Sequence, residues 1–98
     1  MFRHVALFSW TPEATEAQKD ALVAELGKLP GVIGTLRGFH IGPDAGLNPG
    51  NNYDYAVVAE FDDEAGYLVY RDDPEHRRII TEHLRPILAS RAAIQFGS

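Results

Sequence analysis

The nonapeptide FRHVALFSW (Phe2–Trp10) carries apolar side chains at both odd and even positions. It is too short for a core helix, and its content of Val, Leu, Phe and Trp favours a β-strand. Successive side chains of a strand point to opposite faces. One face therefore holds Phe2, His4, Ala6, Phe8 and Trp10, and the other holds Arg3, Val5, Leu7 and Ser9. Because both faces carry apolar side chains, we expect both to be covered in the folded protein.

Downstream of this strand the sequence predicts one amphipathic helix. Thr15 followed by Gln18 is a capping-box pattern, which marks a helix start. The helix is predicted to run to about Leu29, where Pro30 and Gly31 end it. Its core-facing stripe consists of Leu22, Leu26 and Leu29.

The middle of the chain predicts two more strands separated by a loop. A glycine-rich segment at about residues 36–41 predicts a weak, bulged edge strand. Residues 43–52 hold mostly Pro, Gly, Asn and Asp and predict a loop. Residues 53–61 alternate again and have the composition of a central strand. Tyr53, Tyr55, Val57, Ala59 and Phe61 share one face of it, and Ala56 and Val58 share the other.

The C-terminal part predicts two helices and a last strand. Acidic residues 62–64 supply the N-cap and first turn of a short helix that runs through Tyr70. Asp73 caps a further helix whose first residue is Pro74, and Pro86 bends or ends that helix. Residues 92–96 predict the final strand. The inner side of the second helix is predicted to hold Ile79, Ile80, His83, Leu84 and Ile87.

The element order is thus strand, helix, strand, strand, helix pair, strand. In 98 residues, expected to form a single domain over residues 1–98, this order predicts an α+β fold. It is of the ferredoxin-like βαββαβ type, with an antiparallel sheet and helices on one face. The other sheet face carries Val5, Leu7, Ala56 and Val58, and no third layer remains to cover it. We therefore expect a homodimer, in which a second copy covers that face.

Composition and charge exclude several classes of function. The net charge of −5 and the pI near 5.2 oppose nucleic-acid binding, which needs a basic face, and Arg77 with Arg78 is the only basic cluster. The chain has no cysteine, and therefore no disulfide or thiolate chemistry. With no charged leader and no run of eighteen apolar residues, we expect a cytoplasmic protein that does not contact membranes.

The sequence predicts neither a metal nor a cofactor. His76 and His83 lie on one predicted helix at a separation of roughly 10.5 Å, which is too far to share a zinc ion. No glycine-rich phosphate loop is present.

The candidate chemistry therefore rests on histidine and tyrosine. His76 lies in the first turn of a helix, where the helix N-terminus disfavours imidazolium and leaves a neutral base. The alternative is a partly exposed histidine without a function. His4 lies on an apolar strand face, as either a hydrogen-bonded core residue or part of a site. Tyr70 precedes His76 and either hydrogen-bonds a ligand carbonyl or packs with a solvated hydroxyl.

Three segments resemble the Dabb family, the stress-responsive dimeric α/β-barrel domain proteins. They are RHVALF (residues 3–8), YDYAVVAEFD (residues 53–62) and YRDDPEH (residues 70–76). The resemblance spans nearly the whole chain. It implies a ferredoxin-like protomer whose sheet joins that of a partner to form a dimeric α/β barrel.

One class within this family, the olivetolic acid cyclase-type polyketide cyclases, closes a linear polyketide thioester by an intramolecular aldol condensation. The resemblance implies that His76 abstracts an α-proton, that Tyr70 orients this base or binds a carbonyl, and that His4 lines a cavity between sheet and helices. The sequence departs from the cyclase at two positions. Tyr55 replaces a strand histidine, and Gln95 replaces an aspartate that would hold His76 in one tautomer. The carboxylates left to take over that role are Asp72, Asp73 and Glu75.

Two hypotheses follow. The first is a homodimer with an apolar pocket for a small carbonyl-bearing, aromatic or polyketide-like molecule, on which His-based cyclase or aldol-type chemistry takes place. Its expected lining consists of His4, Phe8, Trp10, Tyr55, Tyr70 and His76. The second is a non-catalytic, stress-associated dimer whose histidines satisfy buried hydrogen bonds. A pocket of some hundreds of Å³ beside His76 favours the first hypothesis, and a filled interior favours the second.

Overall fold

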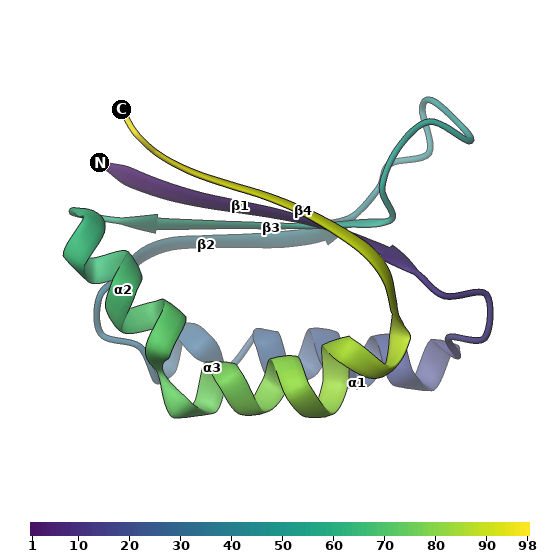
Figure 1. Ribbon diagram of the computed structural model, residues 1–98, viewed down its shortest axis with the longest axis horizontal. Coiled ribbons are helices and arrows are strands. Elements are labelled where there is room, and N and C mark those ends of the chain that lie inside the picture. Colours follow the sequence, from purple (N-terminus) through teal and green to yellow (C-terminus); the bar gives the residue numbers. More distant parts are fainter.

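The computed structural model describes residues 1–98, which form a sheet covered on one face by helices (Figure 1). The four strands are β1 (Phe2–Trp10), β2 (Leu36–Pro43), β3 (Tyr55–Phe61) and β4 (Leu88–Gly97). They are antiparallel and lie in the order β2-β3-β1-β4. The helices are α1 (Glu16–Leu26), α2 (Glu64–Asp72) and α3 (Pro74–Ile79). The predicted ferredoxin-like α+β fold is confirmed. None of the helices has the length and apolar character needed to cross a membrane.

The first helix begins as predicted and ends earlier. The capping box is present, because the Gln18 amide donates to Thr15 Oγ1 at 3.1 Å and the Thr15 amide donates to Gln18 Oε1 at 2.9 Å. The α-helix stops at Leu26, and the separate 3₁₀ turn Leu29–Gly31 follows it. Pro30 has no N–H to donate to Leu26, so the α-helical ladder cannot continue through this turn.

The C-terminal helices follow one another almost without a break. Helix α2 extends to Asp72, two residues past the predicted end. Asp73 then caps α3, because its carboxylate accepts from the Glu75 amide at 2.9 Å and from the His76 amide at 3.1 Å. A π-helical turn over Ile80–Leu84 and a 3₁₀ turn over Arg85–Ile87 continue α3 up to β4.

Two strand boundaries differ from the prediction. Strand β3 begins at Tyr55 rather than at residue 53, because the Asp54 carboxylate instead accepts a hydrogen bond from the Trp10 amide at 2.8 Å. Strand β4 covers Leu88–Gly97 rather than residues 92–96, because it pairs with β1 along nearly its whole length. Strand β2 lies at the sheet edge and has the expected irregularity, between Leu36 and Gly38.

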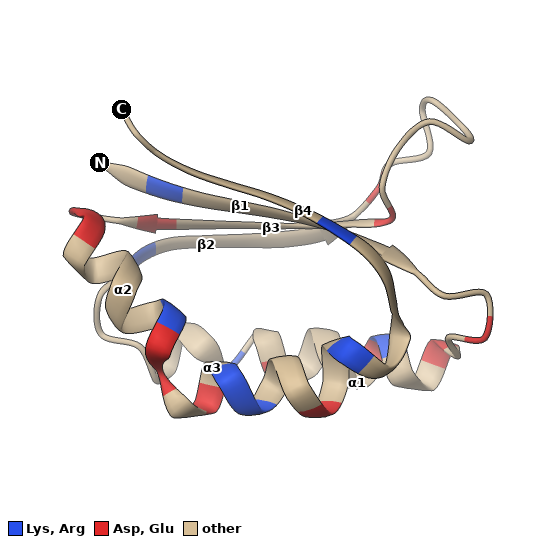
Figure 2. Cartoon of the chain, viewed as in Figure 1, with Lys and Arg blue, Asp and Glu red and all other residues tan.

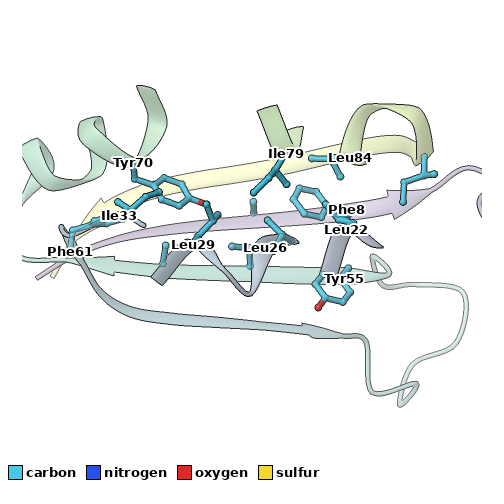
Figure 3. Packing of buried hydrophobic residues seen from close by; sticks show 14 residues of the cluster. Phe8, Leu22, Leu26, Leu29, Ile33, Tyr55, Phe61, Tyr70, Ile79 and Leu84 are labelled. Atoms are coloured by element: carbon cyan, nitrogen blue, oxygen red, sulfur yellow. The ribbon is translucent and has the colours of Figure 1, made fainter. Parts of the chain in front are cut away.

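The core fills the space between the sheet and the helices (Figure 3). Phe61, Leu22, Leu29 and Ile79 are at most 1% exposed. The opposite sheet face has no cover within the chain. There Ile94 and Phe96 of β4, which pair with Val5 and Arg3 of β1, are 60% and 40% exposed.

Candidate functional site

A cavity of about 430 Å³ lies between the helix-facing side of the sheet and the C-terminal helices. Strand β1 contributes His4, Ala6 and Phe8 to its wall, and α2 and α3 contribute Tyr70 and His76. The cavity therefore brings three of the polar side chains singled out in the sequence to one place.

His4 is a buried, neutral histidine. It is 5% exposed, and its Nδ1 lies 2.8 Å from Nε2 of Gln95 on the neighbouring strand β4. An amide nitrogen can only donate, so His4 Nδ1 accepts and the ring proton lies on Nε2. Burial, and after it the positive charge of Arg91, lowers the pKa of His4 to about 4. Gln95, which replaces a carboxylate in the cyclase comparison, therefore orients His4 and not His76.

His76 is held in the tautomer that leaves Nε2 free. Its Nδ1 lies 3.4 Å from the backbone carbonyl oxygen of Arg71, which can only accept, so Nδ1 carries the proton. Burial of the ring lowers the pKa of His76, although the Arg71 carbonyl and the Asp73 carboxylate oppose this. Burial, and not the helix N-terminus expected from the sequence, is therefore the main cause of the neutral imidazole.

Tyr70 lies between the two histidines. Its ring centroid is 4.2 Å from that of His76 and 5.7 Å from that of His4, and the residue is 2% exposed. Burial raises the pKa of the Tyr70 phenol far above its ordinary value, so the hydroxyl remains protonated and can donate a hydrogen bond.

Three polar atoms of this cluster open onto the cavity. Every fully buried side-chain nitrogen and oxygen in the structure has a hydrogen-bond partner. Nε2 of His4, the hydroxyl of Tyr70 and Nε2 of His76 have no partner in the protein, so none of the three is fully enclosed by protein atoms. These three side chains therefore present two donors, on His4 and Tyr70, and one basic acceptor, on His76.

Two of the six expected lining residues lie elsewhere. Phe8 forms part of the cavity wall, but Trp10 and Tyr55 do not. They pack on each other, with ring centroids 5.9 Å apart. Figure 3 shows Tyr55 at the opposite end of the core from Tyr70. They share the helix-facing side of the sheet with His4, as the alternation predicts, but lie outside the cavity wall. Tyr55 is paired with Phe8, one strand away across the sheet.

No carboxylate takes the place of the aspartate that the resemblance implies beside His76. Asp73 caps α3, Asp72 pairs with Arg71 at 2.9 Å, and Glu75 pairs with Arg78. The backbone carbonyl of Arg71 fixes the His76 tautomer instead. No group of three or more His, Cys, Asp or Glu side chains is arranged to hold a metal ion.

The basic side chains of the cavity were not predicted from the sequence. Four arginines line it, namely Arg71, Arg77, Arg85 and Arg91. One signal was present for Arg91, which is four residues before Gln95 on β4 and so shares its face of the strand. The other three come from three separate helical segments, whose arrangement around a cavity depends on tertiary packing.

The arrangement suits a ligand with a carbonyl group. Tyr70 and His4 offer hydrogen bonds to a carbonyl oxygen, and the free Nε2 of His76 can accept a proton from the adjacent carbon. The apolar wall formed by Phe8, Val57 and Leu84 suits an aromatic or aliphatic body.

Comparison with known proteins gives one family and several solved structures. The family model described as Stress responsive A/B Barrel Domain (Dabb) matches residues 2–98. A dimeric ferredoxin-like protein of unknown function from Thermobifida fusca is 42% identical, with a TM-score of 0.89 over 99% of this chain and 90% of that one. A search of curated proteins gives no match.

Two more distant structures show likeness of fold alone. A Dabb family protein from Mesorhizobium loti is 20% identical, with a TM-score of 0.82 over 99% of this chain and 95% of that one. The hydroxynitrile lyase from Passiflora edulis is 17% identical, with a TM-score of 0.84 over 97% of this chain and 90% of that one.

Proposed function

The chain belongs to the Dabb family of stress-responsive A/B barrel domains, and from this premise we propose that it is a homodimer that binds a small carbonyl-bearing molecule in the cavity beside His76. On that molecule it performs cofactor-independent acid–base chemistry of the cyclase or aldol type. The cavity of about 430 Å³ next to His76 is the observation that carries this proposal.

The uncovered sheet face supports the homodimer. Ile94 and Phe96 are exposed on that face, beside the half-buried Val5 and Leu7. Apolar side chains gathered on one face of a sheet are typical of an interface. The 42% identical protein from Thermobifida fusca is described as dimeric. Two such faces packed together form the dimeric α/β barrel that the family resemblance implies.

The size and lining of the cavity support ligand binding. If the interior beside His76 were filled, the histidines would serve only the fold. The volume of the cavity there, about 430 Å³, is instead within the range of small-molecule pockets. The cavity combines an apolar wall with a small number of unpartnered polar atoms, a combination that is typical of binding sites.

The polar atoms support a specific division of roles. Nε2 of His76 accepts a proton from the carbon next to the ligand carbonyl, and the electron pair moves to the carbonyl oxygen. The Tyr70 hydroxyl donates to that oxygen as its negative charge develops. The resulting enolate attacks a second carbonyl of the same molecule, and a carbon–carbon bond forms. The new alkoxide takes the proton back from His76, so no external reagent is consumed.

One observation favours a second candidate function, a stress-associated dimer without catalysis. The bond between His4 and Gln95 satisfies Nδ1 of His4 within the protein, as a purely structural histidine requires. Under this reading the cavity binds no ligand and the three side chains stabilise the core.

Ligand titration separates the two functions. We would record ¹H–¹⁵N spectra of the protein against a panel of phenols and β-keto thioesters. Saturable shifts at residues around His4, Tyr70 and His76 are expected, and their absence across the panel would favour the structural dimer. A Thr81→Trp variant should fill the mouth of the cavity and abolish these shifts. Glu82→Trp changes the adjacent exposed residue, which does not line the cavity, and should retain them.

Proton exchange tests the chemistry without knowledge of the natural substrate. We expect the protein to accelerate exchange of the α-protons of a bound aryl ketone with D₂O, measured by ¹H NMR. His76→Gln should bind the ketone but lose at least about 100-fold of the acceleration, the usual contribution of a general base. Equal acceleration by the variant would remove His76 from the proposed reaction.

A further inference from the structure

Positive charge is concentrated at the cavity in a chain whose net charge is −5. Four of the seven arginines line the cavity, and none of the fourteen acidic residues does. In Figure 2, basic bands lie on α2, on the helical segment that follows it and on β4, which all lie on the near side of the molecule. The rim of the cavity therefore has the opposite charge to the protein as a whole.

The arginines away from the cavity are all paired with carboxylates. Arg3 lies 3.0 Å from Glu60, and Arg37 lies 3.1 Å from Asp62. Arg78 is held by carboxylates from α1 and from its own helix. The positive charge of each of these three arginines is therefore neutralised by a carboxylate of the same chain.

The four cavity arginines have fewer carboxylate partners to neutralise their charge. Arg71 and Arg77 share the single carboxylate of Asp72, at 2.9 Å and 3.5 Å. Arg85 and Arg91 have no carboxylate within ion-pair distance, and no protein group accepts a hydrogen bond from either guanidinium. The cavity rim therefore holds two cations whose donors are free for a ligand.

Arg85 and Arg91 both line the cavity and come from different elements. Arg85 begins the 3₁₀ turn Arg85–Ile87, and Arg91 lies on β4 opposite Phe8, on the face of the sheet that carries the cavity. The charge of Arg91 reaches the cavity floor, because it lowers the pKa of His4. Arg91 is thus within electrostatic range of the atoms that face the ligand.

We propose that the ligand is an anion, a carbonyl-bearing molecule whose carboxylate or phosphate is bound by Arg85 and Arg91 while its carbonyl reaches Tyr70 and His76. Guanidinium groups match both anions geometrically and bind them with charge-assisted hydrogen bonds. The inference rests on the proposed function, since it names the substrate class of the same cavity. It adds that neutral carbonyl compounds are poor ligands.

Three ligands with one aromatic ketone body test this inference. They are 4-oxo-4-phenylbutanoate, its methyl ester, and the phosphonate in which PO₃²⁻ replaces the carboxylate. Dissociation constants would be measured by ¹H–¹⁵N titration for the wild type, Arg85→Gln and Arg91→Gln. Arg37→Gln is the matched control, because it also removes one positive charge but lies outside the cavity. The spectrum of each free variant shows whether it is folded.

We expect at least one anionic ligand to bind the wild type about tenfold more tightly than the ester, a difference of about 1.4 kcal/mol. Arg91→Gln and Arg85→Gln should each reduce this preference severalfold, and Arg37→Gln should leave it unchanged.

The relative affinities identify the kind of anion. Tighter binding of the carboxylate than of the phosphonate indicates that the natural ligand is an organic acid, and the reverse indicates a phosphorylated ligand. Equal binding of ester and anions overturns the anion site but leaves the carbonyl cavity in place. An equal loss in Arg37→Gln also overturns it, because the effect is then one of net charge. Binding of none of the three refutes both the cavity function and the anion site.

Discussion

Lowering the pH from 7 to 5 should destabilise the protein through His4. The pKa of this buried ring is lowered to about 4 in the folded protein, against about 6.5 in an unfolded chain. Between these two values the unfolded state binds a proton that the folded state does not. The free energy of unfolding therefore falls as the pH drops through this window, and it is regained as the pH rises towards 6.5.

The expected size follows from the two protonation equilibria. At pH 5 a histidine of the unfolded chain is almost fully protonated, whereas folded His4 is protonated in about one molecule in ten. Relative to pH 7, this difference lowers the free energy of unfolding by about 2 kcal/mol. Water in the adjacent cavity screens the charge and reduces the loss to between about 1 and 2 kcal/mol. For a domain of this size, the melting temperature falls by roughly 4–8 °C for each kcal/mol.

Urea unfolding at pH 7 and pH 5 would measure this loss in the wild type, in His4→Gln and in His83→Gln. Glutamine does not titrate, so His4→Gln should lose the part of the pH dependence that comes from His4, about 1 to 2 kcal/mol, even though it is less stable at both pH values. His83, which lies outside the cavity, supplies the matched control and should retain the wild-type dependence. The difference between pH 7 and pH 5 in each protein still contains the contributions of His76 and of the carboxylates, which cancel when this difference is compared between variants. Two protein concentrations separate association from folding. A His4→Gln protein with the wild-type pH dependence would refute the assignment of a buried neutral His4.

Three further predictions concern the site and the dimer. The α-proton exchange rate should rise with pH and level off below about pH 7, because the pKa of the His76 base lies below its ordinary 6.5; a rate that still climbs at pH 9 would point to a different base. Tyr70→Phe should weaken ketone binding by about tenfold, the loss expected for a single hydrogen bond, while changing the urea midpoint little; unchanged affinity would show that the hydroxyl does not contact the ligand. Ile94→Asp should raise the dimer dissociation constant by about 100-fold or more, since an unpaired charge is buried at the interface, and light scattering should then detect monomer. Val69→Asp, at a site 51% exposed on α2, is its control, and equal dissociation of both variants would contradict an interface on the sheet.

The order and type of the elements followed from the sequence because their patterns are local. Length and composition identified β1, alternation of apolar residues identified β3, and the Thr15 capping box placed the start of α1. The boundaries that differ depend on contacts between distant segments. The Asp54 carboxylate is used by the Trp10 amide, and β4 is extended by its pairing with β1, neither of which is visible in a window of ten residues.

The candidate site was predictable to a similar extent. Alternation and the family resemblance selected His4, Tyr70 and His76, which the structure brings together around one cavity. Alternation fixes the face on which a strand residue lies but not where on that face a cavity forms, so it could not show that Trp10 and Tyr55 lie outside the cavity. The arginine rim was missed because its members come from four separate elements and have no common spacing.

The position of Gln95 gives the cavity its electrostatic character. An aspartate beside a catalytic histidine stabilises imidazolium, but it also repels negative charge on a ligand. Here a neutral amide orients His4 and a backbone carbonyl orients His76, so both tautomers are fixed without an acidic group. Because four arginines and no carboxylate line the cavity, negative charge that enters with a ligand, or that develops on its carbonyl oxygen, meets a predominantly positive lining. The replacement that removes a carboxylate from the cyclase pattern thus supports both the anionic ligand and an enolate-forming reaction.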